Sequence, residues 1–142
     1  MCLTPAFIFT ARRPRDVVII ADSSNDVSWP AMVYFIKQVV GGVGASPQGT
    51  HYSIIAFANG AMGIVTFPVD PQSISQYNVP LVQRFIDAGA SRRPRGSRHD
   101  VDAALRLART LLTDKRMGAR PNARKVTFVS FLKGIFLEDR WY

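Results

Sequence analysis

The stretch DVVIIADSSND, from Asp16 to Asp26, joins an apolar run, Val17 to Ala21, to an acidic, hydroxyl-rich end. A short apolar run bounded by polar turn residues is typical of a strand buried on both faces, as in a parallel sheet. In an open α/β sheet, ligands bind beyond the carboxyl ends of the strands. Carboxylate and hydroxyl oxygens at that position predict a site for a hard cation such as Mg²⁺, held by Asp22, Ser24 and Asp26.

Hydrophobic periodicity predicts the elements that follow this strand. We expect strands over 17–21, 51–58, 62–67 and 125–132, and helices over 29–40, 79–88 and 101–112. Asn59 and Gly60 form a hairpin turn signal, so the strand over 62–67 should return antiparallel. The order β-α-β-β-α-α-β predicts an α/β fold with a mostly parallel sheet and one antiparallel hairpin strand.

Helical spacing and capping rules predict details of these helices. Ser28 is expected to cap the first helix and Asp100 the third. The inward-facing residues of the second and third helices are expected to be Leu81, Phe85, Ile86, Leu105, Ala108, Leu111 and Leu112.

The net charge of +8 is concentrated in one part of the chain of 142 residues. Twelve Lys or Arg and four Asp lie between Arg84 and Lys125. Such a region could attract nucleic acid, a sulfated glycan or a membrane surface, or it could be a solvated face. The loop arginines that could bind sulfate, phosphate or an acidic partner are Arg92, Arg93, Arg95 and Arg98. No aromatic residue lies among them, which argues against nucleic acid.

Other classes of site lack their sequence signals. The single cysteine, Cys2, excludes an intrachain disulfide and a Cys-rich zinc site. No apolar run approaches the roughly 18 residues of a membrane-spanning helix. In the first 15 residues the arginines follow the apolar stretch, which is the reverse of a signal peptide. There is no phosphate loop, no nucleophile elbow and no nucleophile–base pair, so we expect no enzymatic activity. His51 and His99 are expected to be ordinary surface or strand-end residues.

Four segments in this order resemble the von Willebrand factor A domain, also called the integrin I-like domain. DVVIIADSSNDV resembles its first strand and D-x-S-x-S metal motif, and HYSIIAFANGAMGIVTF its hairpin of the second and third strands. DAALRLARTLL resembles the helix after its threonine loop. GARPNARKVTFV resembles the run before the fourth strand in the extracellular branch of collagen-type A domains, matrilins and integrin I domains. The resemblance covers Asp16 to Leu132 and implies a Rossmann-like, three-layer fold.

This resemblance implies a metal-ion-dependent adhesion site, in which five side chains on three loops bind Mg²⁺. The first Asp and Ser of the family motif correspond to Asp22 and Ser24, and its second Ser is replaced by Asp26. The metal-binding threonine falls on His99, or on Arg98 if the loop has one more residue.

A further departure lies after the fourth strand. The family's last metal-site aspartate falls on Leu132, which Lys133 follows directly. Leucine supplies no oxygen donor and lysine competes with a cation, so the site is expected to be degenerate and to bind Mg²⁺ weakly or not at all. In the alternative structural interpretation, Asp22 and Ser24 cap the following turn through backbone amides.

By the same resemblance, residues 1–15 are an N-terminal extension and residues 16–142 a partial A domain, truncated after the fourth strand. Family members add two more strands and about three helices. The fourth strand would then be an unprotected edge, so we expect marginal stability and self-association.

The resemblance implies a non-enzymatic, extracellular protein-interaction or adhesion module. Its partners would be collagens, other matrix proteins or sister A domains, and its contact surface would include Ser97, His99 and Asp100. The alternative is a module that binds polyanions, such as a sulfated glycan, through the basic region 92–125. Steep weakening by salt would distinguish the second function from the first.

Overall fold

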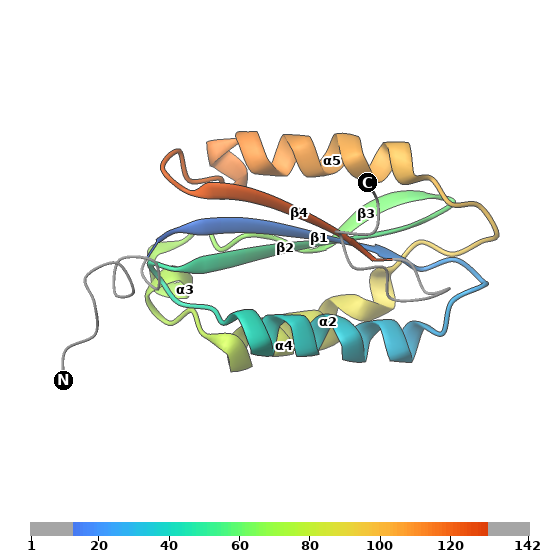
Figure 1. The fold of residues 1–142 in the computed structure, drawn as a ribbon, viewed down its shortest axis with the longest axis horizontal. Coiled ribbons are helices and arrows are strands. Elements are labelled where there is room, and N and C mark those ends of the chain that lie inside the picture. The colour runs from blue at the N-terminus through green and yellow to red at the C-terminus, as the bar shows by residue number, and fades with distance from the viewer. Residues whose placement is uncertain (1–12, 131–142) are drawn as a thin grey trace.

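The computed structural model describes residues 13–130, which form a sheet between two helical layers (Figure 1). The strands are β1 (Arg15–Asp22), β2 (Thr50–Ala58), β3 (Gly60–Val65) and β4 (Arg124–Ser130). Their spatial order is β3-β2-β1-β4. β1 pairs in parallel with β2 and β4, and β3 pairs antiparallel with β2. The mostly parallel sheet with one antiparallel hairpin strand is therefore confirmed.

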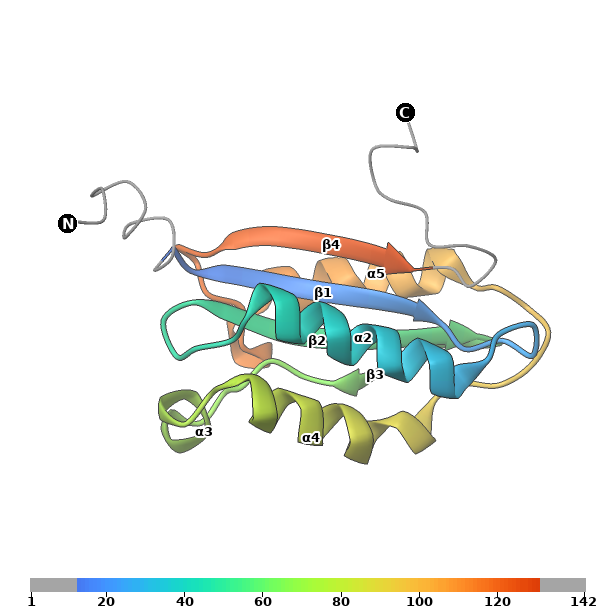
Figure 2. The same cartoon turned by 60° about the horizontal axis from the view of Figure 1, so that its bottom comes forward.

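Helices α2 (Trp29–Val43) and α4 (Val79–Gly89) cover one face of the sheet, and α5 (Val101–Thr113) covers the other (Figures 1 and 2). The remaining elements are the short helix α3 (Pro71–Ser75) and the 3₁₀ turns η1 (Ala90–Arg92) and η2 (Lys115–Met117). The sequence patterns did not predict α3. Its first turn is capped by Asp70, whose side chain accepts a hydrogen bond from Ser73 N.

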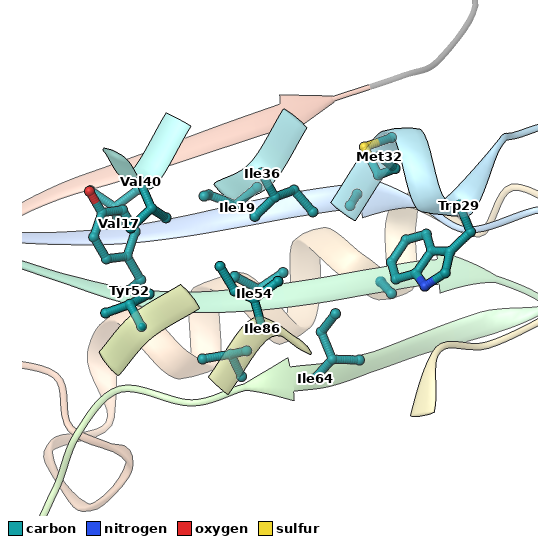
Figure 3. Close-up of a cluster of buried hydrophobic side chains, with 14 of the residues drawn as sticks. Val17, Ile19, Trp29, Met32, Ile36, Val40, Tyr52, Ile54, Ile64 and Ile86 are labelled. Carbon is teal, nitrogen blue, oxygen red and sulfur yellow. The ribbon is translucent and has the colours of Figure 1, made fainter. Parts of the chain in front are cut away.

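The alternation of side chains along β1 explains why its apolar run is continuous. Val17, Ile19 and Ala21 join the core cluster under α2 and α4, part of which Figure 3 shows. Val18 and Ile20 join the second cluster, under α5. Successive strand residues point to opposite faces, so a strand covered on both faces buries side chains at successive positions, which favours a continuous apolar run.

Two predicted core positions are wrong. Phe85 is 39% exposed and Leu105 is 44% exposed. In α5, Ala104 and Ala108 lie against the sheet, and the next residue after Ala104 is rotated by about 100° towards solvent. In α4, the predicted Ile86 is buried, and Val82 is buried in place of Phe85. The sequence pattern predicts a helix in both places. Which side of the helix faces the sheet depends on which residues let it approach closely.

Several predicted boundaries also shift. The strand expected over 62–67 begins at Gly60 and ends at Val65. Ser28 occupies the N-cap position of α2 but makes no side-chain hydrogen bond there, so its predicted cap is wrong. Asp100 does cap α5, because Oδ1 accepts from Ala103 N at 3.2 Å. Leu132 and Lys133 lie outside the described residues.

No helix in the part of the chain that the structure describes is both long enough and apolar enough to cross a membrane.

Candidate functional site

Three loops meet at the carboxyl end of the sheet, at the right of Figures 1 and 2: the loop after β1, the β2–β3 turn, and the loop before α5. Backbone hydrogen bonds join them in pairs. Asn25 N donates to Gly96 O at 2.9 Å, and Asp100 N donates to Ala58 O at 3.0 Å. The end of the sheet where the sequence placed a ligand site is therefore one connected surface.

Ser23 is the buried residue that connects β1 to the other two loops. Its backbone N–H donates to Phe57 O at 2.8 Å. Its Oγ lies 3.1 Å from Phe57 O and 2.7 Å from Pro94 O. Ser23 is not among the site residues predicted from the sequence. In the sequence Ser23 is marked only by its position between the candidate ligands Asp22 and Ser24. That position does not reveal that Ser23 bonds to Pro94, 71 positions away.

Asn59 holds the loop before α5 from the other side. Its Oδ1 accepts a hydrogen bond from Arg98 N at 3.0 Å. Gly96 packs against the same side chain with φ +123°, and a Cβ at this position would collide with the Asn59 amide. Glycine is required here both for its backbone conformation and for the close approach. Asn59 therefore has two roles. It forms the predicted hairpin turn, and it also holds the loop before α5, which the sequence did not reveal.

Asp22 is buried and Ser24 lies directly beside it in the turn. Asp22 Oδ1 accepts a hydrogen bond from Ser24 N at 2.8 Å, as expected for an Asx turn. Ser24 Oγ is also buried, and among residues 13–130 it has no hydrogen-bond partner. The expectation that Ser24 also caps the turn through its side chain is wrong. Its hydroxyl is an unused oxygen in the candidate site.

The imidazole of His99 lies between two carboxylates. Nδ1 is 3.0 Å from Asp22 Oδ2, and Nε2 is 3.2 Å from Asp26 Oδ2. Asp22 is almost fully covered, whereas the side chains of His99 and Asp26 are 42% and 55% exposed. A ring protonated on both nitrogens donates to both carboxylates, and a neutral ring donates to one. His99 lies on the surface, as expected, but its contacts with two carboxylates show that it is not an ordinary surface residue.

The donor set does not fit a divalent cation in this arrangement. Mg²⁺ and Ca²⁺ require several oxygen donors around one point. Here the imidazole ring faces one carboxylate with each nitrogen, so Asp22 Oδ2 and Asp26 Oδ2 are directed at the ring. No group of three His, Cys, Asp or Glu side chains within residues 13–130 could hold a metal ion. The unpartnered Ser24 hydroxyl is the one feature that would suit such an ion.

The other predicted contact residues have separate environments. Asp100 uses one carboxylate oxygen to cap α5 and its backbone N–H to hold the β2–β3 turn. Ser97 is exposed on the same loop. Both residues therefore lie on the same loop as His99. A substitution of Asp100 would also remove the side-chain hydrogen bond that caps α5.

The four loop arginines divide into two pairs. Arg92 donates from Nη2 to Ile64 O at 2.7 Å, and the Arg93 guanidinium lies 5.3 Å from the Trp29 ring centroid. Burial, with the charge of Arg95, lowers the pKa of Arg93. Arg95 and Arg98 are exposed and form no ion pair with any residue of 13–130.

A model of the von Willebrand factor type A domain matches residues 16–131. No curated protein sequence matches the chain. Solved structures of proximal thread matrix protein 1 from the mussel byssus are similar in fold. One crystal form is 17% identical with a TM-score of 0.62, covering 84% of this chain and 28% of that one. Another is 18% identical with a TM-score of 0.61, covering 84% and 29%.

A third structure of the mussel protein is described as having a zinc-occupied MIDAS motif. It is 17% identical, with a TM-score of 0.63, and the match covers 84% of this chain and 28% of the mussel chain. The present chain therefore spans less than a third of the length of these similar structures.

Proposed function

Because the chain belongs to the von Willebrand factor type A domain family, we propose that it is a non-enzymatic protein-interaction module of the adhesion type that binds its partner without a divalent cation. Its contact surface is the carboxyl end of the sheet, formed by the loop after β1, the β2–β3 turn and the loop before α5. This function rests on one observation. The protein's own hydrogen bonds join these loops, and His99 holds the two candidate metal-binding carboxylates.

Hydrogen bonds within the chain hold the loops of the proposed surface together. Ser23 ties β1 to Pro94, Asn59 holds Arg98, and Asn25 bonds to Gly96. A surface that is already ordered loses little conformational freedom on binding. In this form the site is degenerate as a metal centre, and Asp22, Ser24 and Asp26 act by shaping the surface.

The proposed setting is extracellular and the proposed partners are matrix proteins, such as collagens, or other A domains. The support comes from the family and from the mussel byssus matrix protein, whose fold this chain shares. Because the sequence identity is only 17%, the partner is a proposal to be tested directly.

The alternative function is binding of a polyanion such as a sulfated glycan. Fewer of the loop arginines are free to bind the anion than the sequence suggested. Arg92 and Arg93 are engaged by Ile64 O and the Trp29 ring, so Arg95 and Arg98 are the loop cations left to bind an anion. These two lie on the same loop as His99. Both candidate functions therefore use the same surface. The salt dependence of binding distinguishes one function from the other.

The test measures binding of the wild-type protein to immobilised fibrillar collagen and to heparin, in Mg²⁺ and in EDTA, over a series of salt concentrations. We expect saturable collagen binding that is equal in Mg²⁺ and EDTA and weakens only gently with salt. Binding abolished by EDTA would overturn the metal-independent function. Heparin binding that weakens steeply with salt, without collagen binding, would establish the polyanion alternative.

A matched pair of charge reversals locates the surface. Arg98→Glu changes an exposed side chain beside His99, whereas Arg116→Glu changes one that is 91% exposed in η2, after α5. We expect the first variant to lose collagen binding and the second to retain it. Equal losses in both variants would contradict a surface at the carboxyl end of the sheet.

A further inference from the structure

We propose that the side chain of His99 is a built-in substitute for the divalent cation of this site, so that removing the imidazole creates a cation site where residues 13–130 otherwise have none. This inference rests on the proposed function, because it names the group that replaces the metal in joining the loops. The inference predicts that a variant without the ring gains metal binding. This result can be obtained whether or not the protein binds collagen.

The position of the ring is the first argument. From the loop before α5, the ring contacts one oxygen of Asp22 and one of Asp26, which are 77 and 73 positions away in sequence. A metal ion in such a place would join the same two loops through the same carboxylates. The two ring nitrogens face these carboxylate oxygens directly, so a cation and the ring compete for the same oxygens.

The buried hydroxyl of Ser24 is the second, independent argument. Ser24 is 3% exposed, and within the described chain its Oγ has no hydrogen-bond partner. Most buried polar side-chain atoms in proteins are hydrogen-bonded. This unpartnered hydroxyl belongs to the residue whose backbone N–H donates to the buried Asp22 carboxylate, so it is an oxygen that a further ligand could use. With the ring removed, the oxygens of Asp22, Ser24 and Asp26 form a hard donor set, and Mg²⁺ needs only one or two protein carboxylates when water completes its shell.

A role for His99 as a metal ligand fits the geometry poorly. A ligand nitrogen must direct its lone pair at the metal while the other ring nitrogen donates a hydrogen bond. Here both nitrogens are directed at carboxylate oxygens, 3.0 Å and 3.2 Å away. The ring therefore fills the space between the two acids and blocks a shared ion.

The decisive variant is His99→Ser, which removes the ring and adds a short oxygen donor. Arg98→Ser is the matched control. It removes a neighbouring exposed cation but leaves the ring, and its backbone N–H can still donate to Asn59. The double variant His99→Ser with Asp22→Asn tests whether a gained ion uses the buried carboxylate. His99→Ala provides a second variant without the ring.

The measurement is calorimetric titration of each protein with Mn²⁺, Mg²⁺ and Zn²⁺, together with the unfolding temperature with and without Mn²⁺. We expect no saturable binding by wild type or Arg98→Ser. His99→Ser should bind Mn²⁺ roughly tenfold or more tightly than wild type and should unfold at a higher temperature when Mn²⁺ is present. The double variant should lose this gain.

Three outcomes would overturn the inference. The first is saturable Mn²⁺ or Mg²⁺ binding by wild type at the affinity of His99→Ser. The second is Zn²⁺ binding by wild type that His99→Ser abolishes, which would make His99 a ligand. The third is failure of both ring-deletion variants to bind or be stabilised by Mn²⁺, including failure to fold in its presence. A gain of Mn²⁺ binding without any collagen binding would uphold the inference while refuting the proposed function.

Discussion

Oδ1 of Asp16 accepts a hydrogen bond of 2.9 Å from Nε of Arg120, although 104 positions separate the two residues in sequence. Asp16 Oδ2 accepts two more, from Arg120 N at 2.8 Å and Lys125 Nζ at 2.7 Å. Burial raises the pKa of the fully buried Asp16 carboxyl, but these hydrogen bonds outweigh burial and lower the pKa below 3.8. This cluster joins the start of β1 to the segment before β4, at the opposite end of the sheet from His99.

Arg120→Met should destabilise the protein strongly, because it leaves the buried Asp16 carboxylate with Lys125 as its only charged partner among residues 13–130. We expect the free energy of unfolding to fall by about 3 kcal/mol in urea titrations. Arg116→Met is the control, since the Arg116 side chain is 91% exposed and its ion pair with Asp114 is solvated. Similar midpoints and slopes for the two variants would contradict a special role for the Asp16 cluster.

His51 should make the protein less stable in mild acid. It lies near the start of β2, is 1% exposed, and its Nε2 is 2.9 Å from Pro47 O. Burial, aided by the charge of Arg120 and opposed by the contact with Pro47 O and by Asp16, lowers the pKa of His51 below its ordinary value of 6.5. The unfolded chain therefore takes up the proton first as the pH falls. The stability that neutral His51 contributes is complete above pH 6.5 and is lost from there down to the folded pKa.

The variant His51→Gln tests this dependence, because the amide can donate to Pro47 O but does not titrate. The free energy of unfolding, measured in urea from about pH 7 to about pH 5, should decline less with acid in the variant than in wild type. His99 is present in both proteins, so the difference between the curves isolates His51. Parallel curves would refute the prediction.

Gly89 and Gly42 lie in helices but should respond in opposite ways to alanine. A Cβ at Gly89 would collide with Ile64 O in β3 and lie 3.3 Å from Nη2 of Arg92, whereas a Cβ at Gly42 meets nothing within 4 Å. Gly89→Ala should lower the free energy of unfolding by about 1–3 kcal/mol. Gly42→Ala should leave it unchanged or raise it by up to about 1 kcal/mol. Equal effects in thermal or urea unfolding would show that α4 can move away from β3.

The outer edge of β4 should promote self-association. Within residues 13–130, β4 pairs only with β1, and Val126, Phe128 and Val129 are half-buried. The variant Thr127→Lys places a charge at an exposed position of this strand, which discourages edge-to-edge pairing. Light scattering across a concentration series should show association of wild type and less association of the variant. A monodisperse wild-type monomer with one sharp unfolding transition would contradict this expectation.

Most of the fold could be predicted because its signals are local. The continuous apolar run of β1, the Asn59–Gly60 turn and the amphipathic pattern of α5 each occupy a few neighbouring residues, and each correctly predicts a strand, a hairpin or a helix. Phe85 and Leu105 were assigned wrongly to the core because helix phase depends on how closely the helix can approach the sheet. That distance is set by contacts with other elements, such as Gly89 against Ile64.

The candidate site could be predicted only in part. Asp22, Ser24 and Asp26 share one turn, so their proximity follows from the sequence alone. The roles of Ser23 and Asn59 could not be found in this way, because their partners are backbone atoms of the loop before α5. A backbone carbonyl or N–H leaves no mark in the residue pattern, so only its position in space reveals the contact.

The sequence by itself determined that a buried strand ends in an acidic turn at the carboxyl end of an α/β sheet, because apolar periodicity and turn chemistry are properties of adjacent residues. The tertiary structure alone decided what those acids contact. It placed the His99 ring between Asp22 and Asp26, across 77 positions of sequence. That placement depends on where two distant loops meet, which is the result of packing α5 and β2 around the shared core.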